Sequence, residues 1–345
     1  GGGTGWEPPA RGGGSLGWAE GASMPPPALW PPGFAVALGA CRTLLRNFPE
    51  PLVASTAVSQ GFLQPVANNL GFPSFLLPSD VSVKAGSVRG VRGEWFLPSS
   101  SKASAGSTPP RADRLLVWAH GGGFVFCSPG THRLFLARVA SCSGVPVFCV
   151  DYRKPPRAPY PLPVEDVVDA FRGLREQNDD TRLFLGGDSA GGNLAIAATK
   201  ALLREPEASR PASPEGMLLL SPWVDLSEVS GPSWETELDY IPANLAQVVA
   251  KMYAGDIALD DGRLSPARSK DWRGFPPVLL DYAAEEHFRC QIERLERAML
   301  RGGVQVDTKV EGDQVHCYPL WEFAWGWGPG PFQTYFDRVA AFLQR

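Results

Sequence analysis

The fold is decided by one stretch of the sequence, Leu183-Phe184-Leu185-Gly186-Gly187-Asp188-Ser189-Ala190-Gly191-Gly192-Asn193. Its first three residues form an apolar run of strand length, and a helical pattern continues from Asn193 to Leu203. A serine on the sharp turn between a strand and a helix needs strained backbone angles, and neighbours without bulky side chains make room for them. The Ser189 hydroxyl is therefore predicted to project from the top of a sheet, at a helix N-terminus that favours developing negative charge.

Apolar strands alternate with helices on both sides of this turn. Strand-length apolar runs occur at 115–119, 145–150, 217–220, 278–280 and 304–310, and helical periods at 132–140, 164–178, 288–300 and 332–343. Continuous apolar strands are typical of a parallel sheet that is buried on both faces. Two further short strands are expected at 81–84 and 93–97. The sequence predicts an α/β fold with a mostly parallel central sheet flanked by helices, with ligands at the carboxyl ends of the strands.

The rest of the chain falls into three kinds of segment. The Gly- and Pro-rich residues 1–33 have almost no periodic pattern and are predicted to form a disordered leader. Residues 34–345 are assigned to one large domain. Within it, the apolar stretch 34–78 is broken by prolines, and an insertion at 226–264 interrupts the alternation with one expected helix over 241–253.

Composition excludes several classes of function. The formal net charge of −4 provides no excess of basic residues for binding nucleic acid or an anionic membrane surface. No apolar run approaches the roughly 18 residues of a membrane-spanning helix, and no signal-peptide pattern stands at the start. The six cysteines contain no Cys-x-x-Cys pair and are expected to be reduced thiols, which favours a cytoplasmic location.

A serine hydroxyl is a poor nucleophile unless a base takes its proton, and the chain has only four histidines. His120 and His132 stand at a strand end and a helix start, and His287 follows two glutamates. Only His316 lies in a loop between the last predicted strand and the terminal helix, where the base lies in enzymes with a strand–serine–helix turn. His316 is therefore the predicted base.

The run His120-Gly121-Gly122-Gly123 follows the predicted strand 115–119 at its carboxyl end. Successive glycines let backbone N–H groups approach a substrate with no side chain in the way. Together with the N–H of Ala190, this loop is predicted to form an oxyanion hole for the tetrahedral intermediate of acyl transfer.

With these motifs in place, the chain resembles the hormone-sensitive-lipase-type α/β hydrolases, which include bacterial esterases, arylacetamide deacetylases and fungal steryl acetyl hydrolases. The resemblance covers most of the chain from about residue 34 and extends to the segments Asp151-Tyr152-Arg153, Leu220-Ser221-Pro222-Trp223-Val224-Asp225, Ser265-Pro266 and Pro276-Pro277. It implies the α/β-hydrolase fold, with a helical cap formed by about 34–78 and 226–264. It also implies that the first two glycines of the loop, Gly121 and Gly122, supply donors. The chain departs from many members at Arg157, where they have a Glu.

The resemblance also bears on the acidic residue that orients the base. Counting from Pro276-Pro277 at the family's usual interval reaches Glu286, where bacterial members have an Asp; the steryl acetyl hydrolases look similar to this chain there. Glu286 is the predicted acid, and Asp281 and Glu285 remain alternatives. Asp188 is excluded because neighbouring side chains on a tight turn point apart.

These residues predict a carboxylic ester hydrolase that works through an acyl-enzyme on Ser189, with no metal or organic cofactor. Short- to medium-chain apolar acyl esters are the expected substrates, with steryl or aryl acetates as the most specific expectation. The alternatives are an amidase or thioesterase and, in a different class, a non-catalytic small-molecule receptor. The apolar segment 62–77 is expected to pack in the cap, and contact with a lipid surface is its alternative.

Overall fold

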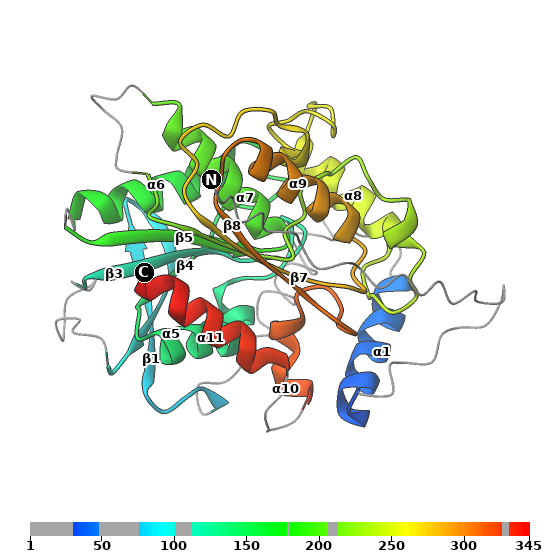
Figure 1. Ribbon diagram of the computed structural model, residues 1–345, viewed down its shortest axis with the longest axis horizontal. Helices are drawn as coiled ribbons and strands as arrows, with labels where there is room; N and C mark the ends of the chain where they lie inside the picture. Colours follow the sequence, from blue (N-terminus) through cyan, green and yellow to red (C-terminus); the bar gives the residue numbers. More distant parts are fainter. Residues whose placement is uncertain (1–29, 48–75, 101–111, 178–179, 206–212, 326–330) are drawn as a thin grey trace, which may run out of the picture.

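A computed structural model describes residues 30–47, 76–100, 112–177, 180–205, 213–325 and 331–345. An eight-stranded sheet runs through the molecule in the order β1-β2-β4-β3-β5-β6-β7-β8 (Figure 1). β1 pairs antiparallel with β2, and β2 antiparallel with β4, whereas all other neighbours are parallel. The strands are β1 (Val81–Val88), β2 (Val91–Pro98), β3 (Arg114–Ala119), β4 (Val147–Val150), β5 (Arg182–Asp188), β6 (Met217–Leu220), β7 (Val278–Ala283) and β8 (Val306–Glu311).

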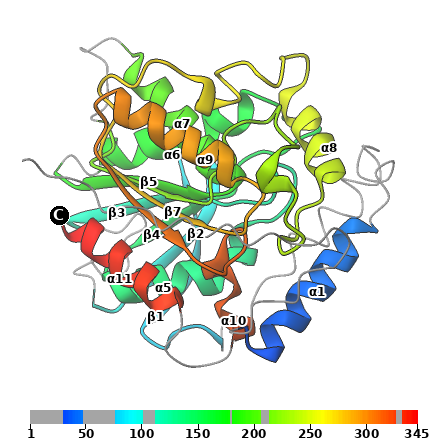
Figure 2. The same cartoon turned by 45° about the vertical axis from the view of Figure 1, so that its right-hand side comes forward.

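Helices cover both faces of this sheet (Figure 2). One face carries α6 (Leu162–Gln177), α7 (Ala190–Leu203) and α9 (Arg289–Arg301), and the other carries α5 (Arg133–Ser143) and α11 (Pro331–Gln344). Each layer has its own apolar core: Phe171 and Leu194 are buried on the first face, and Phe135 packs against Phe336 on the second with ring centroids 6.0 Å apart. The predicted α/β class with a mostly parallel sheet is confirmed.

The expected strands and helices are all present, with ends shifted by a few residues. The largest extension is at β1 and β2, which form an antiparallel hairpin through Arg89 and Gly90, both with positive φ. The expectation that every strand is buried on both faces is wrong for β8, which is almost entirely half-buried. β8 is the edge strand of the sheet and has a neighbour only in β7.

The N-terminal prediction is corrected at its boundary. Residues 1–29 of the predicted leader and residues 48–75 of the predicted cap lie outside the described part of the chain. Residues 30–33, however, are structured: Trp30 is buried and donates from Nε1 to the Asp313 carbonyl at 2.6 Å, and α1 (Pro32–Arg46) begins at Pro32. Pro32 suits the first turn of a helix because the missing N–H has no intrahelical partner there.

The insertion at 226–264 contains a short 3-10 helix, η5 (Pro232–Trp234), and α8 (Ala243–Ala254). α8 packs on the loop after β3, where Tyr253 stacks on Phe124 with ring centroids 3.8 Å apart. A short 3-10 helix η7 (Tyr318–Trp321) and α10 (Glu322–Trp325) lie between β8 and α11 and contact α1. None of the described helices has the length and apolar character needed to cross a membrane.

Candidate active site

Ser189 lies on the sharp turn between β5 and α7 with φ 53° and ψ −123°, as a strand–serine–helix turn requires. The turn can form because two glycines allow close backbone approach: a Cβ on Gly187 would lie 2.4 Å from the Gly191 carbonyl, and one on Gly191 would lie 2.0 Å from the Ala119 oxygen. The last residue of β6 and the segment after it hold both peptide groups of Ser189. Its N–H donates to the Leu220 carbonyl and its carbonyl accepts from the Trp223 N–H, each at 2.9 Å.

The Asp188 side chain faces away from this turn and organises the loop after β3. Its buried carboxylate accepts from Trp118 Nε1 at 2.9 Å and from the Gly121 N–H at 3.1 Å, and His132 Nε2 lies 3.1 Å from the same oxygen as Gly121. The exclusion of Asp188 as the orienting acid agrees with this geometry. The role predicted for Gly121 does not fit it, because its N–H already has a carboxylate partner and is not available to an oxyanion.

The next two glycines leave their N–H groups free. Gly122 and Gly123 have φ of 108° and 61°, and neither N–H forms a hydrogen bond within the described part of the chain. Ala190 is the first residue of α7, so its N–H has no intrahelical acceptor and lies at the positive end of the helix dipole. The described residues therefore offer backbone donors at Gly122, Gly123 and Ala190.

Glu286 and His316 are brought together from loops that follow β7 and β8. Glu286 Oε1 lies 3.5 Å from His316 Nδ1, and both residues are buried. The other oxygen, Oε2, accepts from Ser221 Oγ at 2.6 Å and from the Ala283 N–H at 2.9 Å. The 3.5 Å separation is longer than a well-formed hydrogen bond, and the two side chains form an ion pair when the His316 ring is protonated.

His316 Nε2 lies 3.3 Å from Cys317 Sγ, and His316 forms no hydrogen bond with Ser189 Oγ within the described residues. The end of β6 nevertheless links the serine to the acid and the base. Ser221 lies between the two residues that hold Ser189, donates to Glu286, and accepts from the Cys317 N–H at 3.1 Å. The short segment 220–223 is thus bonded to the Ser189 backbone, to the Glu286 side chain and to the residue after His316.

The electrostatic surroundings raise the pKa of the His316 imidazole above its ordinary value. Burial alone favours the neutral ring, but the close contact with the Glu286 carboxylate and its negative charge, with the charges of Asp239 and Asp188, outweigh burial. The same groups stabilise the protonated His316 ring relative to the neutral ring.

The two alternative acids lie elsewhere. Asp281 pairs with Arg338 at 2.8 Å and accepts from the Tyr318 hydroxyl at 3.4 Å, on the side of the sheet that α11 covers. Glu285 accepts from Thr236 Oγ1 of the insertion at 3.3 Å. Of the three carboxylates, only Glu286 faces His316.

Two residues of this site were missed by the sequence reasoning. Ser221 belongs to a segment that was recognised only as a family resemblance, and its bond to Glu286 depends on a positive φ of 45° that the sequence does not reveal. Asp239 accepts from the backbone N–H groups of His287 and His316, and it stands in the insertion with no motif around it.

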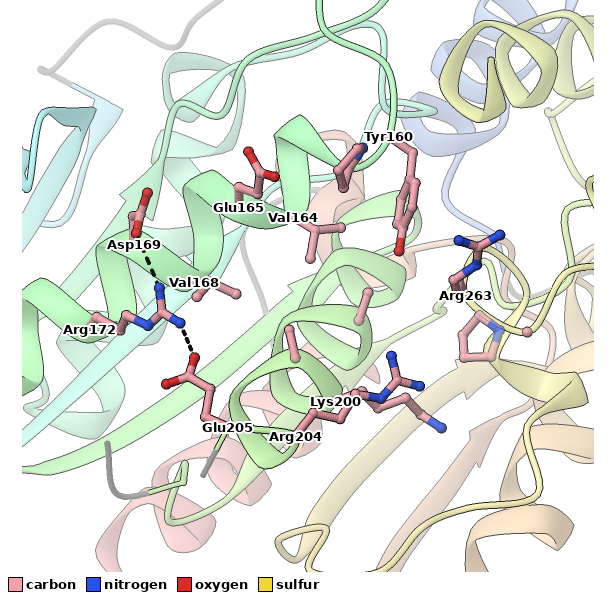
Figure 3. Close-up of a pocket in the computed structure, with 15 residues that line it drawn as sticks. Tyr160, Val164, Glu165, Val168, Asp169, Arg172, Lys200, Arg204, Glu205 and Arg263 are labelled. Atoms are coloured by element: carbon pink, nitrogen blue, oxygen red, sulfur yellow. Dashed lines mark hydrogen bonds and ion pairs between the residues drawn. The ribbon is translucent and has the colours of Figure 1, made fainter. Parts of the chain in front are cut away.

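A cavity of about 540 Å³ lies apart from this site, between α6 and α7 (Figure 3). It is lined by basic and acidic side chains, several of them already paired: Arg172, for example, contacts both Asp169 and Glu205. A second cavity, of about 560 Å³, is lined by Trp234, Thr236 and Ile241 of the insertion and by His287, the residue after Glu286. None of the predicted site residues lines either cavity.

Comparison with known proteins places the chain among enzymes. A family model described as the alpha/beta hydrolase fold matches residues 116–320. An acetyl-hydrolase from Streptomyces hygroscopicus is 35% identical over 219 residues, covering 61% of this chain and 70% of that protein. An esterase from Acinetobacter venetianus is 31% identical over 254 residues, covering 72% of this chain and 78% of the relative. The crystal structure of an esterase from the bacterial hormone-sensitive lipase family has a TM-score of 0.72 at 27% identity, covering 91% of this chain and 98% of that one.

The fold and the strand–serine–helix turn define the class of protein as an α/β hydrolase. The chain belongs to the α/β-hydrolase family, in its hormone-sensitive-lipase-type branch. It is an ester-hydrolysing serine hydrolase, and the expected family and enzyme class are confirmed.

Proposed function

We propose that the enzyme hydrolyses carboxylic esters through an acyl-enzyme on Ser189, with His316 as the base and Glu286 as the residue that orients it. One observation carries this proposal: the Glu286–His316 ion pair stands at the same edge of the sheet as the strained Ser189 turn. The carboxyl ends of β5, β7 and β8 supply the three residues, which is where α/β enzymes place their ligands.

In this mechanism Ser189 Oγ attacks the ester carbonyl while His316 Nε2 takes its proton. Nε2 is the available nitrogen because Nδ1 faces Glu286, which fixes the tautomer and stabilises the imidazolium. His316 then returns the proton to the leaving alcohol. Water repeats the cycle on the acyl-enzyme and regenerates the free hydroxyl of Ser189.

The oxyanion of each tetrahedral intermediate is bound by the N–H groups of Ala190 and Gly122, with Gly123 in place of Gly121. The free N–H groups of Gly122 and Gly123 and the helix-start position of Ala190 support this assignment. Removing one such donor typically costs roughly 3 to 4 kcal/mol of transition-state stabilisation.

Apolar esters with a short acyl group, including steryl or aryl acetates, are the proposed substrates. Aromatic packing beside the proposed base supports an apolar substrate: Phe288 stands perpendicular to the His316 ring at 4.9 Å, and Trp223 stacks on Phe288 at 5.2 Å. The similarity to a protein named acetyl-hydrolase supports a small acyl group.

A chromogenic ester series of increasing acyl length tests this proposal, run beside Ser189→Ala and beside matched amide and thioester substrates. We expect kcat/KM to be highest for short acyl esters and turnover to be lost in Ser189→Ala. Activity that survives in this variant would show that the nucleophile is misassigned. Preference for the amide or the thioester would replace the proposed bond specificity.

A further inference from the structure

Asp239 is a buried carboxylate in the insertion, between η5 and α8. Oδ2 accepts the backbone N–H of His287 at 2.8 Å, and Oδ1 accepts the backbone N–H of His316 at 3.2 Å. Oδ1 also accepts from its neighbour, the Tyr240 N–H, at 2.9 Å. One side chain of the insertion is therefore bonded both to the residue that follows Glu286 and to His316 itself.

The bonding of Asp239 is not that of an ordinary stabilising ion pair. Within the described part of the chain no Lys or Arg lies at ion-pair distance, and the nearest titratable nitrogen is His287 Nδ1 at 3.7 Å. Burying a carboxylate is costly unless hydrogen bonds or an opposite charge compensate. Here the Arg42 charge on α1 contributes from beyond ion-pair distance, and direct contacts come from three backbone N–H groups. Two of these three groups belong to the loops that carry the acid and the base.

Neighbouring residues of the insertion reinforce the same contacts. The Tyr240 hydroxyl donates to the His316 carbonyl at 3.3 Å, so the backbone of His316 is held on both its N–H and its C=O. The His287 ring lies between the carbonyls of Ile241, at 2.7 Å, and Thr236, at 3.1 Å. The segment 236–241 thus forms hydrogen bonds with both loops.

From this geometry we infer that Asp239 is a positioning residue, which fixes the spacing between Glu286 and His316 by holding the backbones of both loops. The inference rests on the catalytic roles proposed for these two residues. Asp239 contacts neither the serine nor the reacting atoms, and it acts only through the pair that it holds.

Asp239 also contributes negative charge to the surroundings of the base. The titratable groups around His316 are Glu286 at 3.5 Å, the Cys317 thiol at 3.3 Å, the Tyr240 hydroxyl, and the carboxylates of Asp239 and Asp188. Asp239 is among the charges that raise the pKa of His316, after Glu286.

The test is Asp239→Asn, which keeps the shape of the side chain but removes the charge and one acceptor. We expect kcat to fall about 10- to 100-fold with KM changed less than about 2-fold, because misplacement of a reacting group by about an ångström costs rate and not binding. The acid limb of the kcat/KM profile moves to lower pH. Glu237→Gln is the matched control: it removes the same charge from an exposed position two residues away, and its profile stays that of the wild type.

A normal kcat and an unshifted pH profile in Asp239→Asn overturn the inference, as does an effect on KM alone. If Asp239→Asn does not fold, Asp239→Glu keeps the charge while moving the acceptors: a reduced kcat with an unshifted acid limb supports the inference, and a normal kcat overturns it. Inactivation by a sulfonyl fluoride at several pH values reports the reactivity of Ser189 without turnover. We expect the acid limb of the inactivation rate to move to lower pH in Asp239→Asn.

Two further measurements distinguish a failure of the proposed function from a failure of the inference about Asp239. If Ser189→Ala or His316→Ala remains active, the proposed function fails whatever Asp239 does. If both variants are inactive, the catalytic roles stand. The inference about Asp239 then still fails if the losses of activity in Asp239→Asn and Glu286→Gln add up in the double variant, because the effects of residues that act through one another are not additive.

Discussion

At the scale of single residues, the site depends on which of three nearby carboxylates faces the imidazole. Glu285 and Glu286 are adjacent in the sequence, yet Glu285 bonds to Thr236 and Glu286 pairs with His316. Ser221 and the Ala283 N–H fix this difference, because they hold the far oxygen of Glu286 and leave the near one for the ring. The geometry of the acid is therefore set by two hydrogen bonds that no motif in the sequence predicts.

Replacing Glu286 by Gln removes the charge that faces His316 Nδ1. We expect kcat to fall at least about 100-fold, since the amide neither stabilises the imidazolium nor selects the tautomer as a carboxylate does. Steady-state kinetics with a short-chain chromogenic ester measure the change. Glu285→Gln is the control and is expected to be nearly normal; the reverse order of the two variants would transfer the role to Glu285.

The pH dependence follows from the raised pKa of His316. A base must be unprotonated to accept a proton, so kcat/KM rises with pH through the pKa of the imidazole. We expect the midpoint of that acid limb above pH 6.5, the ordinary value for histidine. It moves to lower pH in Glu286→Gln, where the largest favourable partner of the imidazolium is lost. A midpoint well below 6.5 in the wild type would contradict the electrostatic account.

At the scale of elements, the turn between β5 and α7 is the feature that tolerates least change. Gly191 packs so closely on Ala119 that even one methyl group has no space. We expect Gly191→Ala to destabilise the fold by about 3 kcal/mol or more and to abolish activity, as overpacking against backbone cannot relax easily. Urea unfolding measures the loss. Gly262→Ala, at a glycine with open space around its Cβ position, is the control and is expected to change stability by less than about 1 kcal/mol.

The same turn shows how much of the fold could be predicted from the sequence. Apolar periodicity depends on near neighbours in the chain, so the strands and the helices could be predicted from it, and the position of Ser189 from the Gly-rich stretch between a strand and a helix. The partner of the Gly121 N–H could not, because it depends on the side-chain direction of Asp188, 67 residues away. Asp239 was missed for a related reason: it precedes the predicted helix of the insertion and stands in no motif, and its contacts with His287 and His316 exist only after the loops have met.

At the scale of the whole molecule, a cluster of charged side chains joins β7 to α11 and the start of β8. Asp281 on β7 pairs with Arg338 on α11 at 2.8 Å, and Arg338 also pairs with Asp307 on β8. Burial nevertheless raises the pKa of Asp281 to about 7, with Arg338 and Lys309 opposing it. Ionising this carboxylate in the folded state is therefore harder than in the unfolded chain.

Because of this shift, the contribution of Asp281 to the free energy of unfolding decreases as the pH rises. Between about pH 4 and 7 the unfolded chain releases the Asp281 proton while the folded protein retains it, so the contribution of this group decreases across that range and is constant above it. We expect the free energy of unfolding of Asp281→Asn to increase relative to the wild type between pH 4.5 and 8, as measured by urea unfolding at each pH. If the free energy of unfolding of the wild type increases relative to that of the variant instead, the ion pair with Arg338 outweighs the burial of Asp281.

The hydrogen bonds that Leu220 and Trp223 form with the Ser189 backbone have one more consequence. With its main chain fixed on either side, the hydroxyl can travel only by torsion about the Cα–Cβ bond. If Ser189 is the nucleophile, as proposed, acylation and deacylation then require rotation of its side chain and no rearrangement of its backbone. We therefore expect the enzyme to hydrolyse esters in the crystal or in an immobilising matrix, provided that the substrate can diffuse to Ser189.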